Sequence, residues 1–155
     1  VDQILAASGG TAQGSEDLFT AARLDKLLSE GRYVMVDFTA DWCLTCKVLE
    51  KAVLKTDKVQ QALDDRKVVQ LIADWSDKDS PLGEQISNEL DQLGKGKQLP
   101  IIAFYFPNDR DNPRTLVAAY TTDGVMEIVN EIPVPEPADE LVGESSPNTE
   151  TISVN

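Results

Sequence analysis

Cysteine is the residue type in this chain whose position most directly suggests chemistry. The chain has two cysteines, Cys43 and Cys46, separated by two residues. An apolar, β-branched run typical of a buried strand precedes them, and apolar side chains at positions 49, 52 and 53 follow at helical spacing. The first N–H groups of a helix lack backbone partners and favour an anion such as a thiolate. This spacing predicts a redox-active dithiol in which Cys43 attacks and the less exposed Cys46 resolves.

A structural disulfide is the alternative role for this pair. It would close a very small loop and therefore remove little entropy from the unfolded chain. The sequence contains no histidine, which excludes Ser-His and Cys-His catalysis, and two thiolates without imidazole cannot complete a zinc site of the usual ligands. We therefore expect disulfide exchange with no metal and no cofactor, since the disulfide itself carries the electrons.

Two acidic residues are candidates to support the cysteines. Asp37 lies inside the predicted buried strand, where burial raises the pKa of a carboxyl and makes it a candidate to exchange a proton with Cys46. Glu50 lies four residues beyond Cys46, on the same helical face, where its charge would oppose thiolate formation. The alternatives are a solvated strand end for Asp37 and a surface glutamate facing Lys47 and Lys51 for Glu50.

The elements that position these residues alternate along the chain. Thr20 and Ser80 are candidate N-caps, Pro81 suits a first helical turn, and Gly31 and glycines near 94 suit helix ends. Helices are predicted over 21–30, 43–54, 58–65, 81–93 and 122–132. Strands are predicted over 34–39, 68–73, 99–106 and 115–120, with a short edge strand at 18–19. Strands separated by helices, followed by a hairpin and a helix, predict an α/β fold: a central mixed β-sheet flanked by helices on both faces.

The stretch from Val36 to Lys47 resembles the active-site segment of the thioredoxin superfamily, including an acid six positions before the first cysteine. More narrowly, Phe38-Thr39-Ala40-Asp41-Trp42-Cys43-Leu44-Thr45-Cys46-Lys47 with Glu50 is similar to the C-terminal thioredoxin-like domain of DsbD-type thiol:disulfide interchange proteins, as is the later stretch 73–79. The resemblance covers roughly residues 18–130. It implies the thioredoxin fold and a tuning role for the acids at positions 37 and 50.

The resemblance also implies a docking surface for substrate. It places a cis-proline at Pro100, next to Leu99 and beside the disulfide, whereas an ordinary trans proline at a strand start is the alternative. Trp42 would flank the exposed sulfur or simply pack, and Trp75 would border the site or lie in the core. Leu44 and Thr45 replace the Gly-Pro of thioredoxin proper, at positions that help to set the reduction potential.

Composition limits the partners. The net charge is −13, and residues 131–155 hold six of the 27 acids and no base, which disfavours nucleic acid and anionic membranes. No run approaches the roughly 20 apolar residues of a membrane span. We expect a flexible leader at 1–14, a thioredoxin-like domain at 15–132 and a disordered, acidic, proline-rich tail at 133–155. Since Val1 is an unusual first residue, we expect an excised domain or mature fragment.

These observations together predict a monomeric protein-disulfide reductase in the periplasm, as the soluble domain of an inner-membrane protein. By resemblance, a membrane domain would donate its electrons, and disulfide isomerases or cytochrome c maturation proteins would receive them. Two alternatives remain open. One is a free-standing thioredoxin-like cytochrome c maturation reductase or oxidase, and the other is a non-catalytic binding module with the same fold.

Overall fold

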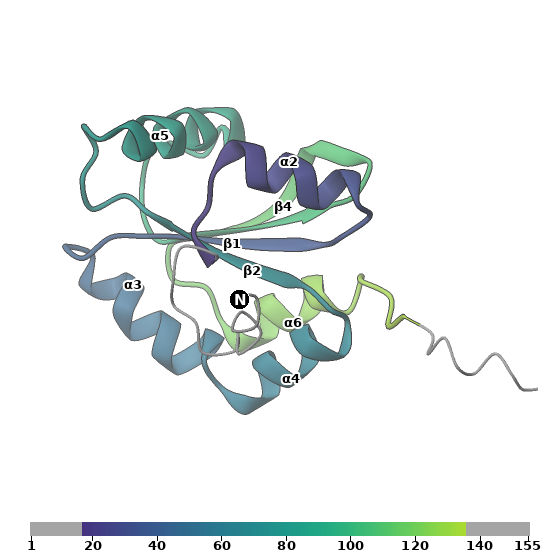
Figure 1. Ribbon diagram of the computed structural model, residues 1–155. Coiled ribbons are helices and arrows are strands. Elements are labelled where there is room, and N and C mark those ends of the chain that lie inside the picture. Colours follow the sequence, from purple (N-terminus) through teal and green to yellow (C-terminus); the bar gives the residue numbers. More distant parts are fainter. Residues whose placement is uncertain (1–16, 136–155) are drawn as a thin grey trace, which may run out of the picture.

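A four-stranded sheet forms the centre of the computed structural model, which describes residues 17–135 (Figure 1). Its strands are β1 (Val34–Thr39), β2 (Val69–Asp74), β3 (Ile101–Phe106) and β4 (Asp109–Val117), in the order β2-β1-β3-β4. β1 runs parallel to β2 and antiparallel to β3, and β3 and β4 form an antiparallel hairpin. Every residue of β1 is buried, as its apolar run predicts, and this strand leads directly to the cysteines.

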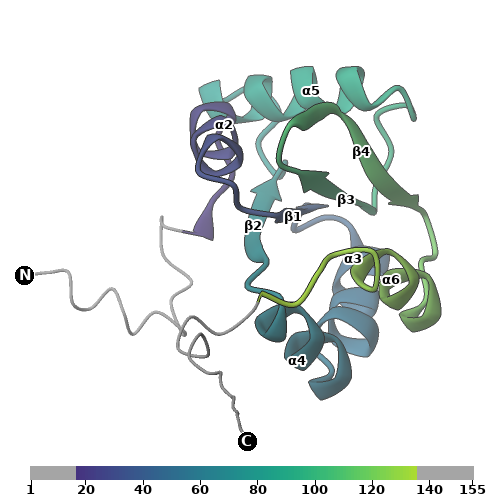
Figure 2. The same ribbon diagram turned by 90° about the vertical axis from the view of Figure 1, so that its right-hand side faces the viewer.

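Helices cover both faces of the sheet (Figures 1 and 2). One face carries α2 (Ala21–Ser29) and α5 (Pro81–Leu93). The other carries α3 (Leu44–Leu49), its π-helical continuation η3 (Glu50–Leu54), α4 (Asp57–Asp65) and α6 (Thr122–Val129). Within residues 17–135, no helix is long and apolar enough to cross a membrane. The predicted α/β architecture, a mixed sheet between two helical layers, is confirmed.

Side-chain alternation along β1 decides which residues face the cysteine helix. Val34, Val36 and Phe38 pack in the core against α2 and α5. Met35 belongs to the other core, with α4 and α6. Since successive strand residues point to opposite faces, Asp37 shares the face of Met35 and therefore looks toward α3 and η3.

Local capping explains where the helices begin and end. The hydroxyls of Thr20 and Ser80 accept hydrogen bonds from backbone N–H groups of the first turns of α2 and α5, and Pro81 opens α5, as predicted. Gly94 ends α5 in the left-handed conformation, with φ of 70°. The predicted caps thus fix the ends of the layer opposite to the cysteines.

Three predictions about elements are wrong. β4 begins at Asp109 rather than at residue 115, because the polar stretch read as a loop is a half-buried edge strand, where a proline is tolerated. The hairpin turns at Asn108, with φ of 70°, and β4 ends before Tyr120. The expected edge strand at 18–19 is reduced to a single bridge between Leu18 and Ile72.

The third difference lies in the cysteine helix. α3 is not continued as an α-helix to Leu54 but widens into the π-helical η3, in which the Lys55 N–H donates to the Glu50 carbonyl oxygen at 2.8 Å. A π-helical turn contains more residues than an α-helical turn, so the next side chain that faces the core lies further along the sequence. Val53 and Leu54 are therefore buried, whereas Ala52, predicted to face inward, is exposed. The predicted leader at 1–14 and most of the predicted tail lie outside the described residues.

Candidate active site

Cys43 and Cys46 form a disulfide at the start of α3, with their Cα atoms 5.3 Å apart. Cys43 is the N-cap residue of α3, and its Sγ accepts a hydrogen bond from the Cys46 N–H at 3.2 Å. Cys43 is 8% exposed and Cys46 is 0% exposed, in the order predicted for an attacking and a resolving sulfur. The Cys43 sulfur therefore lies where unpaired N–H groups and the helix dipole favour a thiolate.

The segment before β3 closes the site from the side. Leu99 packs against the small cluster of Ala40, Cys43 and Cys46, and the Leu99–Pro100 peptide bond is cis. The Pro100 carbonyl oxygen accepts a hydrogen bond from the Ala118 N–H at 2.8 Å, which ties this segment to the end of β4. Leu99 thus lies beside the disulfide, and the cis peptide bond joins it to Pro100.

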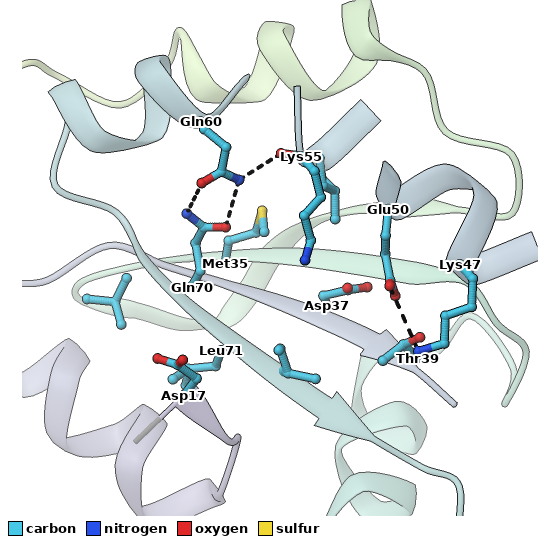
Figure 3. Close-up of a pocket in the computed structure, with 13 residues that line it drawn as sticks. Asp17, Met35, Asp37, Thr39, Lys47, Glu50, Lys55, Gln60, Gln70 and Leu71 are labelled. Carbon is cyan, nitrogen blue, oxygen red and sulfur yellow. Dashed lines mark hydrogen bonds and ion pairs between the residues drawn. The ribbon is translucent and has the colours of Figure 1, made fainter. Parts of the chain in front are cut away.

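The carboxyl groups of Asp37 and Glu50 line the same pocket (Figure 3). Asp37 is 7% exposed, and its Oδ1 has no hydrogen-bond partner among the described residues. The Glu50 Oε2 is also buried and unpartnered in this part of the chain, while its Oε1 lies 4.0 Å from the Lys47 ammonium. The solvated alternative for Asp37 is therefore wrong. Glu50 has its lysine contact, but it faces inward and not only toward solvent.

The pKa of Asp37 is raised well above its usual 3.8. Burial is the largest cause, and the charge and hydrogen bonding of Glu50 act in the same direction, whereas the positive charges of Lys47 and Lys55 oppose them. The pair lines a cavity of about 610 Å³ between β1, β2 and η3, into which both lysines extend (Figure 3). This arrangement can take up or release a proton close to the dithiol.

Tyr120 is a component of this region that the sequence analysis missed. It is 5% exposed, and its hydroxyl is another buried group with no partner within residues 17–135. The pKa of Tyr120 is raised by burial and by the charges of Asp37 and Glu50, which places the ring near both carboxyls. Ala118 has a positive φ of 66° just before it, and neither feature follows from a local sequence pattern.

The outer surface of the site is apolar. Trp42 is 54% exposed and Leu44 is 76% exposed, and Thr45 is exposed between the cysteines. Val48, one turn further along α3, is also exposed and was not predicted. Trp42 is therefore not a buried packing residue, which was the alternative. Trp75 combines both of its predicted roles, since it is buried in the core and its ring lies 6.3 Å from that of Trp42. In the described part of the chain, no cluster of three or more Cys, Asp or Glu side chains could hold a metal ion.

Comparisons with known proteins agree with this geometry. Residues 17–107 match the family model described as thioredoxin-like. A thiol:disulfide interchange protein DsbD of Salmonella typhimurium is 31% identical over 103 residues, which is 65% of this chain and 17% of that protein. A DsbD of a Pseudomonas species is 34% identical over 80 residues, or 44% of this chain and 14% of that protein. The chain thus spans less than a fifth of the length of these relatives.

Solved structures with the same arrangement of elements include the oxidised C-terminal domain of DsbD from Neisseria meningitidis, with a TM-score of 0.55, 20% identity, and coverage of 75% of this chain and 99% of that one. A thioredoxin from Thermus thermophilus has a TM-score of 0.54 and 19% identity, and the match covers 75% of this chain and 87% of that one. At this identity they establish the thioredoxin fold, as the sequence predicted.

Proposed function

Because this chain belongs to the thioredoxin-like family, we propose that it is a thiol:disulfide oxidoreductase that reduces disulfides in partner proteins. One observation carries the proposal: the Cys43–Cys46 disulfide caps α3, and the continuation of that helix in η3 brings Glu50 against the buried Asp37 of β1. A structural staple has no need of two buried, unpartnered carboxyl oxygens on the strand and helix that flank it, because each costs stability. A dithiol that must lose and regain protons does need such groups.

The reaction moves two electrons from the dithiol to the partner. The Cys43 thiolate attacks one sulfur of the partner disulfide, which forms a mixed disulfide and releases the first partner sulfur as a thiolate. Cys46 loses its proton and attacks the Cys43 sulfur, which closes the Cys43–Cys46 disulfide and releases the second partner thiolate. Both partner sulfurs are then reduced, and a dithiol donor must reduce the protein again before the next cycle.

Asp37 has the role of proton acceptor for Cys46 in this sequence of steps. Its raised pKa makes its carboxylate a stronger base than an ordinary aspartate, and Asp37 lies on the face of β1 that looks toward α3, the helix that carries Cys46. Glu50 strengthens that basicity because its charge disfavours the ionised form of Asp37. Lys47 lies 4.0 Å from Glu50 and limits the effect.

Trp42, Leu44 and Thr45, together with Leu99 and Pro100, form the proposed docking surface for the partner. The first three are exposed around Cys43, Leu99 packs against the two cysteines, and Pro100 follows it through the cis bond. Exposed aromatic and aliphatic side chains around a reactive atom suit a polypeptide, which can cover them when it binds. We propose that the protein acts as a monomer, since the reaction needs only one such surface.

The similarity to DsbD supports a wider proposal about the parent protein. We propose that this chain is the periplasmic domain of an inner-membrane protein, with a membrane domain as electron donor. Disulfide isomerases or cytochrome c maturation proteins would be the acceptors. The matched relatives are several times longer than this chain, which leaves room for such a membrane domain.

The first test is the equilibrium reduction potential of the cysteine pair against a dithiothreitol or glutathione series. A value near the reducing end of the thioredoxin-like range, about −270 mV, supports a reductase. In pull-downs, C46S should accumulate mixed disulfides and C43S should trap none. A value near −120 mV, the oxidising end of the range, would reverse the direction and make the protein a disulfide donor. A pair that does not titrate would leave a binding module.

A further inference from the structure

Lys78 contacts the two tryptophan rings next to the cysteines. Its ammonium nitrogen lies 4.8 Å from the centroid of the Trp42 ring and 4.4 Å from that of Trp75. Trp75 is fixed in the core at 5% exposure, whereas Trp42 is 54% exposed and directly precedes Cys43. One cation therefore links an immobile ring to the exposed ring at the attacking sulfur.

The loop that carries Lys78 is tied to the active-site segment. The Trp75 N–H donates to the Thr39 carbonyl oxygen at 2.8 Å, at the end of β1. The Ser76 hydroxyl donates to the Asp74 carboxylate and accepts from the Asp41 N–H, the latter at 2.7 Å. Asp41 is the residue before Trp42, so this hydrogen bond fixes the backbone next to Trp42 relative to the loop that carries Lys78.

The start of α5 fixes the other side of the loop. The Ser80 hydroxyl caps Gly83 at 2.9 Å and donates to the Asp77 carbonyl oxygen at 2.8 Å. Gly83 is packed so closely that a Cβ there would overlap the Asp77 and Lys78 backbone. The backbone at Lys78 is therefore held on both sides, although its side chain is exposed in a polar loop.

We propose that Lys78 is a positioning residue that holds the Trp42 ring beside Cys43 and thereby sets the affinity for protein disulfides. The inference rests on the proposed function and adds a determinant to it. A cation over an aromatic face favours that arrangement by about two- to fivefold at an exposed site. An exposed ring that is already held in place loses less rotational freedom when a partner covers it, so the partner binds more tightly.

An ordinary surface lysine would act differently. Such a lysine would attract an acidic partner through its charge alone, and its removal would leave the tryptophans unchanged. The chain has two tryptophans, and both belong to this cluster, so intrinsic fluorescence reports on it without labelling. Position and charge can therefore be separated in one set of variants.

The test uses the whole chain with three substitutions. K78M keeps most of the side-chain length and removes the charge, and K78R keeps a cation. K58M, at an exposed lysine of α4, is the control. Turnover of insulin disulfides with dithiothreitol as reductant gives KM and kcat, and acrylamide quenching gives access to Trp42. K78M should raise KM about two- to fivefold and increase quenching. K78R should restore most of the wild-type KM and most of the protection from quenching, and K58M should match the wild type in both measurements.

Separate outcomes overturn the two proposals. If K78M keeps the wild-type KM and quenching, Lys78 does not position Trp42. If K78R is as impaired as K78M, the cation over the rings is not the cause. If the wild type reduces no protein disulfide, the proposed function fails, and the quenching series alone then decides whether Lys78 holds the ring.

Discussion

Replacing Asp37 with asparagine should make the protein more stable at neutral and alkaline pH. The side chain is 7% exposed, its Oδ1 has no partner within the described residues, and the Glu50 carboxylate adds a like charge. Asparagine keeps the shape and removes the charge. Because an unsatisfied buried polar group costs about 1–3 kcal/mol and a charged one more, D37N should raise the free energy of unfolding by about that amount where Asp37 is ionised.

The pH dependence gives the sharper form of this prediction. The folded pKa of Asp37 is raised above its usual 3.8, so the folded state holds more protons than the unfolded state between these two values. The stabilising contribution of the protonated group is complete below about pH 3.8 and is lost as the pH rises through the folded pKa. D37N should remove this loss, and the two proteins should become equally stable as the pH approaches 3.8.

Urea unfolding of the oxidised proteins at a series of pH values measures this difference. With urea m values of about 1–3 kcal/mol per M, the expected gain shifts the midpoint by about 1 M at alkaline pH. D64N, at an exposed carboxyl on α4, is the matched control and should follow the wild type. If the free energy of unfolding of D37N and that of the wild type change in parallel with pH across the whole range, the assignment of a buried, proton-holding Asp37 is refuted.

D37N should also slow partner reduction by about 100-fold, because it removes the proposed general base.

Three further predictions concern other parts of the structure. E50Q should lower the pKa of Asp37 toward its usual value, because Glu50 is its second largest perturbation, and the same urea series should show the stability loss ending at a lower pH. E89A should destabilise the protein by about 1–3 kcal/mol, since it leaves the buried Tyr105 hydroxyl without its acceptor and removes two bonds from Arg110, which keeps its ion pair with Asp25; urea unfolding should show this, with the reduction potential unchanged. S80A should cost about 1 kcal/mol through loss of the α5 cap, and an unshifted unfolding midpoint would contradict it.

Local patterns predicted the parts of the fold that local physics determines. The apolar run of β1 is buried along its whole length, and Ser80, Pro81 and Gly94 bound α5 where capping chemistry places them. The order of exposure of the two cysteines follows from one turn of helix. These features need no information from elsewhere in the chain.

The parts that the sequence did not reveal depend on contacts between distant residues. Tyr120 lies near Asp37 because β4 ends early and the chain turns at Ala118, and nothing in its neighbours encodes that approach. In the sequence, Lys78 is one charged residue of a polar loop, and only the fold places its ammonium over the rings of Trp42 and Trp75. The first half of edge strand β4 was missed because a half-buried edge strand can be as polar as a loop.

The widened turn η3 connects these observations. Glu50 opens it, and the carbonyl of Glu50 accepts from the Lys55 N–H, so the helix departs from α geometry where a carboxylate must lie against Asp37. Lys55 also enters the cavity and lowers the pKa of Asp37, against the effect of Glu50. The two ends of this turn therefore carry Glu50, whose negative charge raises the pKa of Asp37, and Lys55, whose positive charge lowers it. Unpartnered carboxyl oxygens and an irregular helix each reduce stability, and they occur together in the continuation of the helix that the disulfide caps. That coincidence is what a site adapted for proton movement, rather than for stability, would be expected to show.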